Sequence, residues 1–187
     1  LNTEPAYEEL NQYDNVILAI GAHNMELPMS VENSNVVSSW DVLNGEAVSG
    51  NCAVLGGGLV GTETAEFLAQ KGLKVSIIEM LSQIATGESE TVMPLIMKDF
   101  EEHDVKQYVN TKVKSIENNV IFATNTKDGA DITIEADTII NALGSKKNLF
   151  DDSKLTVPFE YVGDCSGERT ADISVAIRSG YQAGNEI

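Results

Sequence analysis

A glycine-rich turn between an apolar strand and a helix constrains the fold of this chain more than any other feature. The stretch from Cys52 to Glu79 reads CAVLGGGLVGTETAEFLAQKGLKVSIIE. Its apolar runs at 53–55 and 75–78 predict two buried strands, and residues 59–71 between them predict a helix that ends at a glycine. A strand–helix–strand unit of this length predicts parallel strands with the helix packed on the sheet.

The glycine spacing in this unit is GxGxxG, which is typical of a dinucleotide-binding turn. Gly56 permits the tight turn, Gly58 lets the backbone approach a pyrophosphate, and Gly61 allows close packing of helix and sheet. The free amides and the positive dipole end of the helix would then face the phosphates. A glycine-rich turn without a ligand is the alternative, but the matching strands, helix and following acid disfavour it. The residues predicted to bind the pyrophosphate are Gly56, Gly57, Gly58, Leu59, Val60 and Gly61.

Glu79 ends the second strand, at a position where an acid can accept both hydroxyls of the adenosine ribose. A 2′-phosphate would be repelled by this carboxylate and would require a basic partner. No Lys or Arg occurs between Val75 and Met97. The sequence therefore favours NAD(H) over NADP(H).

Bulk properties exclude several classes of protein. The formal net charge of −17 argues against partners such as nucleic acid and anionic membrane surfaces. No apolar run is long enough to span a bilayer, and the polar start shows no signal peptide. A first residue Leu1 rather than Met predicts a piece excised from a longer chain. The cysteines, Cys52 and Cys165, predict buried reduced thiols in a cytoplasmic protein, and the isolated His23 and His103 predict no metal site.

The flanking segments predict further elements. Residues 15–20 predict a buried strand, and 23–50 a connection with a short strand near 36–37 and a helical turn near 41–43. Residues 91–103 predict a second helix. The residues expected to face inward are Val60, Thr64, Phe67 and Leu68 on the first helix and Val92, Leu95, Ile96 and Phe100 on the second.

From residue 105 to 142 the apolar period is two, which predicts an antiparallel meander. The expected strands are 105–109, 113–116, 120–124, 132–134 and 138–140, with turns at 118–119 and 127–129. Residues 160–164 predict a strand that ends in Gly-Asp. A helix over about 171–187, interrupted by Gly180 and Gly184, closes the chain.

The order of these pieces resembles the two-dinucleotide flavoproteins typified by glutathione reductase, in which an NAD(P)-binding domain is inserted into an FAD-binding domain. Three more motifs carry the resemblance: Leu18–Ala22 and Asn141–Gly144, where the chain would leave and re-enter the FAD domain, and Thr156–Asp164, TVPFEYVGD. The implied fold class is α/β, a Rossmann-like FAD/NAD(P)-binding fold with a parallel sheet, helices and a three-stranded antiparallel meander. Residues 28–145 would form the NAD(H)-binding domain, and 1–27 and 146–187 remnants of the FAD-binding domain.

Three short sequence segments narrow the resemblance to one branch of this family. The segments YDNVILAIGA, VVSSWDVLNG and GGGLVGTETAEFLAQKG are similar to NADH:flavin oxidoreductases of the 2-enoate reductase and 2,4-dienoyl-CoA reductase type. The resemblance implies a parent that also carries a barrel with FMN and a 4Fe-4S cluster. This chain lacks the barrel, the cluster cysteines and the first FAD glycine motif. The missing barrel and FAD-domain segments are therefore expected partners, together with NAD(H) and FAD.

The resemblance also implies roles for individual residues. Glu63 would lie near nicotinamide and flavin, although an acid favoured by the helix dipole is an equal alternative. Ala142, Leu143 and Gly144 would line the nicotinamide side, unless they form a strand end without a ligand. Gly163 and Asp164 would touch FAD, unless Asp164 caps a helix.

The implied activity is hydride transfer from NADH to FAD, without a catalytic side chain in this chain. A disulphide reductase, an NADH oxidase and a non-catalytic nucleotide-binding module are the alternative functions. The organic substrate is not predicted.

Overall fold

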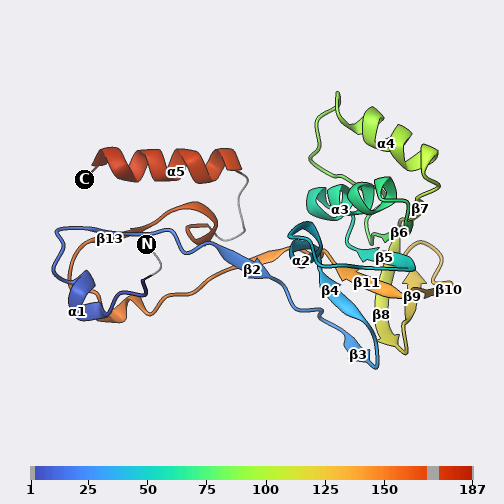
Figure 1. Ribbon diagram of the computed structural model, residues 1–187, viewed down its shortest axis with the longest axis horizontal. Helices are drawn as coiled ribbons and strands as arrows, with labels where there is room; N and C mark the ends of the chain where they lie inside the picture. Colours follow the sequence, from blue (N-terminus) through green and yellow to red (C-terminus); the bar gives the residue numbers. More distant parts are fainter. Residues whose placement is uncertain (1–2, 168–172, 187) are drawn as a thin grey trace. The chain divides into compact units, whose positions relative to one another are not determined.

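A computed structural model describes residues 3–167 and 173–186. The chain divides into two compact units, one of residues 1–23 with 145–187 and one of residues 24–144. The second, which we call unit 2, contains the glycine loop (Figure 1). The assignment of 28–145 to NAD(H) binding and of the flanking segments to FAD binding stays a prediction.

The centre of unit 2 is a five-stranded sheet in which every pairing is parallel. In spatial order its strands are β4 (Val36–Ser38), β11 (Thr138–Asn141), β5 (Asn51–Leu55), β6 (Lys74–Ile78) and β7 (Lys106–Tyr108). β5 and β11 are buried on both faces, as parallel strands between two covering layers are. The expected parallel sheet is confirmed.

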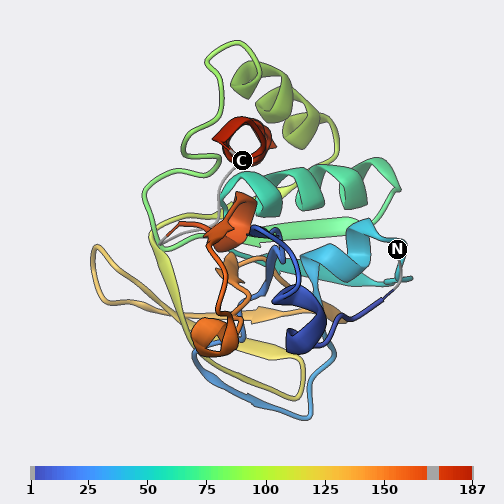
Figure 2. The same ribbon diagram turned by 90° about the vertical axis from the view of Figure 1, so that its left-hand side faces the viewer.

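Helices cover one face of this sheet. They are α2 (Ser39–Leu43), α3 (Leu59–Gln70) and α4 (Met93–Glu102). Their apolar core includes Leu68 of α3 and Phe100 of α4, packed with Val54 and Ile77 from the sheet. In Figures 1 and 2, α3 and α4 lie on the side of the sheet opposite the meander.

The meander covers the other face. Its strands are β8 (Thr111–Glu117), β9 (Val120–Asn125) and β10 (Asp131–Glu135), which pair antiparallel in sequence order. Asn118 and Asn119 both have positive φ, as the expected hairpin turn requires. Ile116, Ile121 and Ile134 pack with alternate residues of the central strands in a second core.

Two expectations for this region were wrong. The strands at 105–109 and 138–140 belong to the central parallel sheet rather than the meander. The reason is that the spacing of apolar residues shows which side chains of a strand are buried, but not which strand it pairs with. β3 (Ser30–Glu32), unforeseen within the 23–50 connection, pairs parallel with β8. Its side chains are exposed, so no apolar pattern marked it.

The inward faces of the helices were only partly predicted. Ile96 and Phe100 are buried, but Val60, Val92 and Leu95 have 39, 39 and 65% of their surface exposed. Val60 lies in the first turn of α3, and Val92 precedes α4. Leu95 is displaced around α4 from the buried stripe of Ile96 and Phe100, which are one helical turn apart.

The other unit, unit 1, has little regular sheet. β1 (Val16–Leu18) pairs parallel with β13 (Phe159–Tyr161). β2 (Ala22–Asn24), whose last residue belongs to unit 2, pairs with β12 (Ser145–Lys147). Its helices are α1 (Tyr7–Leu10), the 3-10 turns η1 (Asp152–Lys154) and η2 (Gly163–Cys165), and α5 (Ile173–Glu186).

α5 is one continuous helix, so the predicted interruption at Gly180 and Gly184 was wrong. A glycine inside a helix costs only about 1 kcal/mol relative to alanine, which packing elsewhere can offset. Residues 171, 172 and 187 of the expected helix lie outside the described residues. The predicted strand at 160–164 ends at Tyr161, and Gly163 begins η2.

Candidate dinucleotide-binding site

The carboxyl ends of three neighbouring strands bring the predicted site residues together. Gly56 follows β5, Glu79 follows β6 and Ala142 follows β11. The Gly56 amide donates to the Ile78 carbonyl oxygen at 2.9 Å, and the Ala142 amide donates to the Leu55 carbonyl oxygen at 2.9 Å. Ligands of open parallel sheets bind at this edge.

The glycines differ in what a side chain would meet. Gly56 has φ +101°, and a Cβ there would come within 2.6 Å of the Ala142 carbonyl oxygen. A Cβ at Gly61 would overlap the carbonyl oxygen of Gly56. Gly58 faces open space, since no atom beyond its neighbours in the chain lies within 4 Å of its Cβ position. Packing therefore requires Gly56 and Gly61 to be glycine, whereas it leaves Gly58 free.

Among the described residues, no side chain caps the amino terminus of α3. Its N-cap is Gly58, which has no side chain to accept a hydrogen bond, and the first turn of α3 contains no acid. The Thr62 amide makes the first helical bond, to the Gly58 carbonyl oxygen at 2.9 Å. The amides of Leu59, Val60 and Gly61 come earlier and lack an acceptor within the helix. An anion is the natural partner for such an end.

The Glu79 carboxylate accepts hydrogen bonds from two separate backbone segments. One oxygen accepts from the Gly57 amide and the other from the Leu81 amide, each at 2.7 Å. Glu79 is half-buried, and its backbone amide donates to the Tyr108 carbonyl oxygen at 2.9 Å. Two amide donors fix the orientation of the carboxylate beside the glycine loop.

Sequence reasoning missed the segment that supports this loop. Ile84 and Ala85 are buried, and the Ala85 amide donates to the Gly57 carbonyl oxygen at 2.6 Å. The available signal was this apolar pair within the otherwise polar stretch 82–90. Gly57 occupies an unrestricted position of GxGxxG, but a Cβ there would come within 2.7 Å of Ile84.

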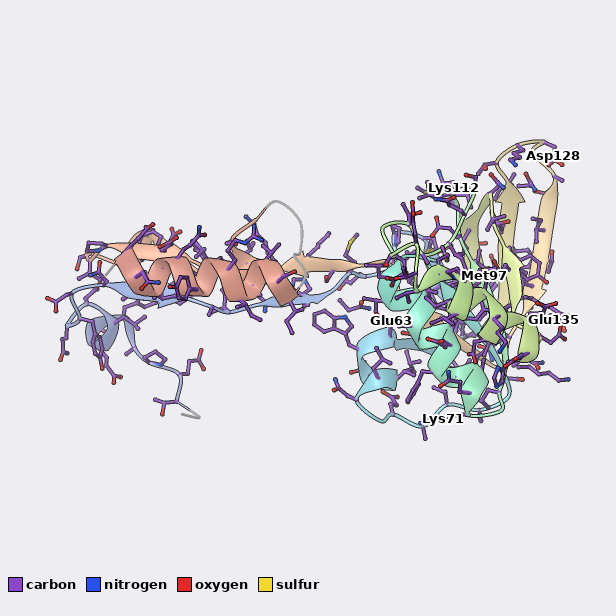
Figure 3. The ribbon with its side chains drawn as sticks, turned by 90° about the horizontal axis from the view of Figure 1, so that it is seen from above. Glu63, Lys71, Met97, Lys112, Asp128 and Glu135 are labelled. Carbon is purple, nitrogen blue, oxygen red and sulfur yellow. The ribbon has the colours of Figure 1, made fainter. Side chains whose placement is uncertain are left out.

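A basic residue adjacent in sequence to a backbone partner of Glu79 was also missed. Lys112 directly follows Thr111, whose amide donates to the Glu79 carbonyl oxygen at 2.8 Å. Lys112 lies 33 residues beyond Glu79 in the sequence, so no local pattern links the two. Figure 3 labels Lys112, which lies on β8, and Glu63, which lies on α3. Glu63 is exposed and lies beyond the first turn of α3.

The side chain of Asn141, the last residue of β11, holds the end of this strand in place. Asn141 donates through Nδ2 to the Met25 carbonyl oxygen at 2.6 Å and accepts through Oδ1 from the Leu143 amide at 3.2 Å. Gly144 has φ +115° and accepts from the Met25 amide at 2.9 Å. Leu143 is 37% exposed and adjoins Gly56, so the strand end presents an apolar surface beside the glycine loop.

The predicted FAD residues lie in unit 1. Gly163 has φ +69°, and its amide donates to the Ser179 hydroxyl of α5 at 2.9 Å. Asp164 follows it within η2 and is half-buried. Cys165 donates through its thiol to the carbonyl oxygens of Leu18 and Val162, each at 3.1 Å, which ties η2 to the end of β1.

The two cysteines are free and buried, as the sequence predicts. Burial first, and the charge of Asp137 second, raise the pKa of the Cys52 thiol to about 11. Within the described residues, no three His, Cys, Asp or Glu side chains are arranged to hold a metal ion. None of the described helices is long and apolar enough to cross a bilayer.

The sequence is similar to those of characterised oxidoreductases. It is 43% identical over 179 residues to bilirubin reductase of Mediterraneibacter gnavus, covering 93% of this chain. It is 31% identical over 189 residues to NADH oxidase of Thermoanaerobacter brockii, also over 93% of this chain. The chain spans 28% of the length of each of these two relatives.

Solved structures share the fold. 2-Naphthoyl-CoA reductase matches with a TM-score of 0.84 at 23% identity over 100% of this chain and 29% of its own. Histamine dehydrogenase from Rhizobium sp. 4-9 matches with a TM-score of 0.84 at 17% identity, over 100% and 33%. The family model described as pyridine nucleotide-disulphide oxidoreductase, whose members bind NAD(P) and FAD, matches residues 2–164. This chain belongs to the pyridine nucleotide-disulphide oxidoreductase family.

Proposed function

We propose that unit 2 binds NADH and presents its nicotinamide to FAD in a flavin-dependent oxidoreductase. The observation that carries this proposal is the pairing of an uncapped α3 amino terminus, open at Gly58, with the oriented Glu79 carboxylate. The first suits a pyrophosphate and the second suits a ribose diol. These groups fit a dinucleotide without a 2′-phosphate.

Each part of the site has a role in this proposal. Amides from Gly58 to Gly61 hold the phosphates, Glu79 accepts the ribose hydroxyls, and Ala142 to Gly144 with Glu63 line the nicotinamide end. When bound, NADH supplies the hydride that reduces the flavin. The chain's own contribution is to orient the nucleotide, which requires no acid or base among these residues.

Unit 1 supports the idea that further segments complete the flavin site. Both core clusters of the described residues belong to unit 2. In unit 1, by contrast, α5 leaves Ile173, Ile177 and Tyr181 between 67 and 79% exposed. These three residues repeat every four positions along one stripe of the helix. Such a stripe is typical of a surface that another element covers.

In the parent protein, we propose that Gly163 and Asp164 contact FAD and that a barrel with FMN and a 4Fe-4S cluster receives the electrons, as in enoate and dienoyl-CoA reductases. The similarity to bilirubin reductase and the fold of 2-naphthoyl-CoA reductase support this branch. The 31% identity to an NADH oxidase favours a second candidate, an NADH oxidase that shares the same nucleotide site.

Calorimetric titration of the purified chain with NADH and NADPH tests the nucleotide assignment. We expect NADH to bind at least about tenfold more tightly, a difference of about 1.4 kcal/mol. The reason is that a 2′-phosphate would displace a hydrogen bond at Glu79 and meet its charge. Glu79→Ala should narrow this preference, whereas Lys112→Ala should leave NADH binding unchanged. Equal or tighter binding of NADPH by the wild-type chain would refute the assignment.

A second measurement concerns turnover. With FAD supplied in solution, the chain should oxidise NADH no faster than the uncatalysed reaction. Holding two reactants in contact is worth about 7–11 kcal/mol, and the segment with the FAD glycine motif is not part of this sequence. Absorbance at 340 nm would follow the reaction. Saturable NADH oxidation would show that unit 1 alone suffices to hold the flavin.

A further inference from the structure

We propose that residues 80–85 form a latch that fixes the glycine loop in the orientation that receives the dinucleotide, with Ile84 and Ala85 as positioning residues. This inference rests on the proposed NADH site and extends it to residues that need not touch the ligand. The latch is attached at both ends, once through Glu79 and once through Gly57.

The first attachment is the Glu79 carboxylate. One of its oxygens accepts from the Leu81 amide at the start of the latch, and the other accepts from the Gly57 amide. The Leu81 carbonyl oxygen accepts from the Asn110 amide at 2.8 Å, which anchors the latch to the start of β8. A carboxylate oxygen has about two acceptor sites, so both oxygens can still accept a ribose hydroxyl.

The second attachment is Ala85. Its amide donates to the Gly57 carbonyl oxygen at 2.6 Å. Ala85 has φ +51° and is 2% exposed. A residue with a side chain rarely adopts this left-handed backbone, and it persists only where the surroundings impose it. The left-handed turn directs the Ala85 amide to the glycine loop.

Ile84 packs against the loop directly above this turn. It is 3% exposed and belongs to the apolar core that includes Leu68 of α3. A Cβ added at Gly57 would lie 2.7 Å from Ile84 Cγ2 and 2.9 Å from Glu79 Cβ. The Gly57 backbone therefore lies against both side chains, with no room for one of its own.

Together these contacts hold the Gly57 residue from both sides. Its N–H is bound by Glu79, its C=O is bound by Ala85, and Ile84 fills the space beside it. Gly57 precedes the N-cap Gly58, so a rotation at Gly57 would turn the first free amides of α3 away from the phosphates. A loosened latch should then weaken nucleotide binding without removing any group that contacts the ligand.

The test compares two buried isoleucines of the same core in the 187-residue chain. Ile84→Ala removes the latch contact, and Ile96→Ala removes an equally buried side chain of α4. Both should lower the thermal midpoint. Only Ile84→Ala should raise the calorimetric Kd for NADH, by about tenfold, which corresponds to about 1.4 kcal/mol. Ile84→Val, which loses only the δ-methyl group and keeps the Cγ2 methyl that lies against Gly57, should restore most of the affinity.

Amide hydrogen exchange without nucleotide provides a second readout. Ile84→Ala should accelerate exchange at Gly57, Leu81 and Ala85, and Ile96→Ala should not. If the wild-type chain binds NADH but Ile84→Ala and Ile96→Ala have equal Kd values, the latch proposal is overturned and the proposed function stands. A wild-type chain that fails to bind NADH would overturn the proposed function and the latch with it.

Discussion

Gly61→Ala should lower the free energy of unfolding of the chain by about 3 kcal/mol, the upper end of the cost of overpacking. The added Cβ would overlap the Gly56 carbonyl oxygen and come within 3.2 Å of Ala142 Cβ. The backbone of Gly56 at the end of a buried strand, and the Cβ of Ala142, cannot move aside as the far end of a flexible side chain can. For a chain of this size, the midpoint of thermal unfolding should fall by about 10 °C.

Gly58→Ala is the matched control, because it places the same methyl group three residues earlier. No atom beyond the neighbouring residues of the chain lies within 4 Å of that Cβ position, and φ at Gly58 is −68°. Its unfolding midpoint should therefore remain within a few degrees of the wild-type value. Circular dichroism melts of both variants would decide the matter. Similar midpoints for the two would mean that α3 does not approach the sheet as closely as described.

Elements were predictable where one local pattern determined them. The glycine loop, α3 and the hairpin at Asn118-Asn119 each combine turn residues with the correct apolar period. The membership of β7 and β11 in the parallel sheet was not predictable, because partner choice depends on the rest of the fold. The exposure of Leu95 was missed for a related reason: a helix can carry more apolar residues than its neighbours cover.

The residues of the candidate site divide in the same way, into those set by a local pattern and those set by the rest of the fold. GxGxxG and Glu79 could be predicted from their spacing, since a dinucleotide-binding turn would require a particular residue type at each of these positions. Ile84, Ala85 and Lys112 approach the site only through tertiary contacts. The same is true of the steric requirement at Gly57, which the motif leaves unrestricted.

Gly58→Val should abolish NADH binding while the fold is retained. Its side chain would occupy the open space where we expect the pyrophosphate to approach the backbone, so at least two amide–phosphate hydrogen bonds would be lost. Each hydrogen bond to a charged group is worth about 1.5–3 kcal/mol, which predicts a rise in Kd of about 100-fold or more. The extended backbone at Gly58 accommodates a β-branched residue, and valine as N-cap should cost only about 1 kcal/mol of stability. Titration calorimetry and a thermal melt on the same preparation separate the two effects. A folded Gly58→Val chain with wild-type affinity for NADH would mean that the phosphates bind elsewhere, and the uncapped end of α3 would then need another partner.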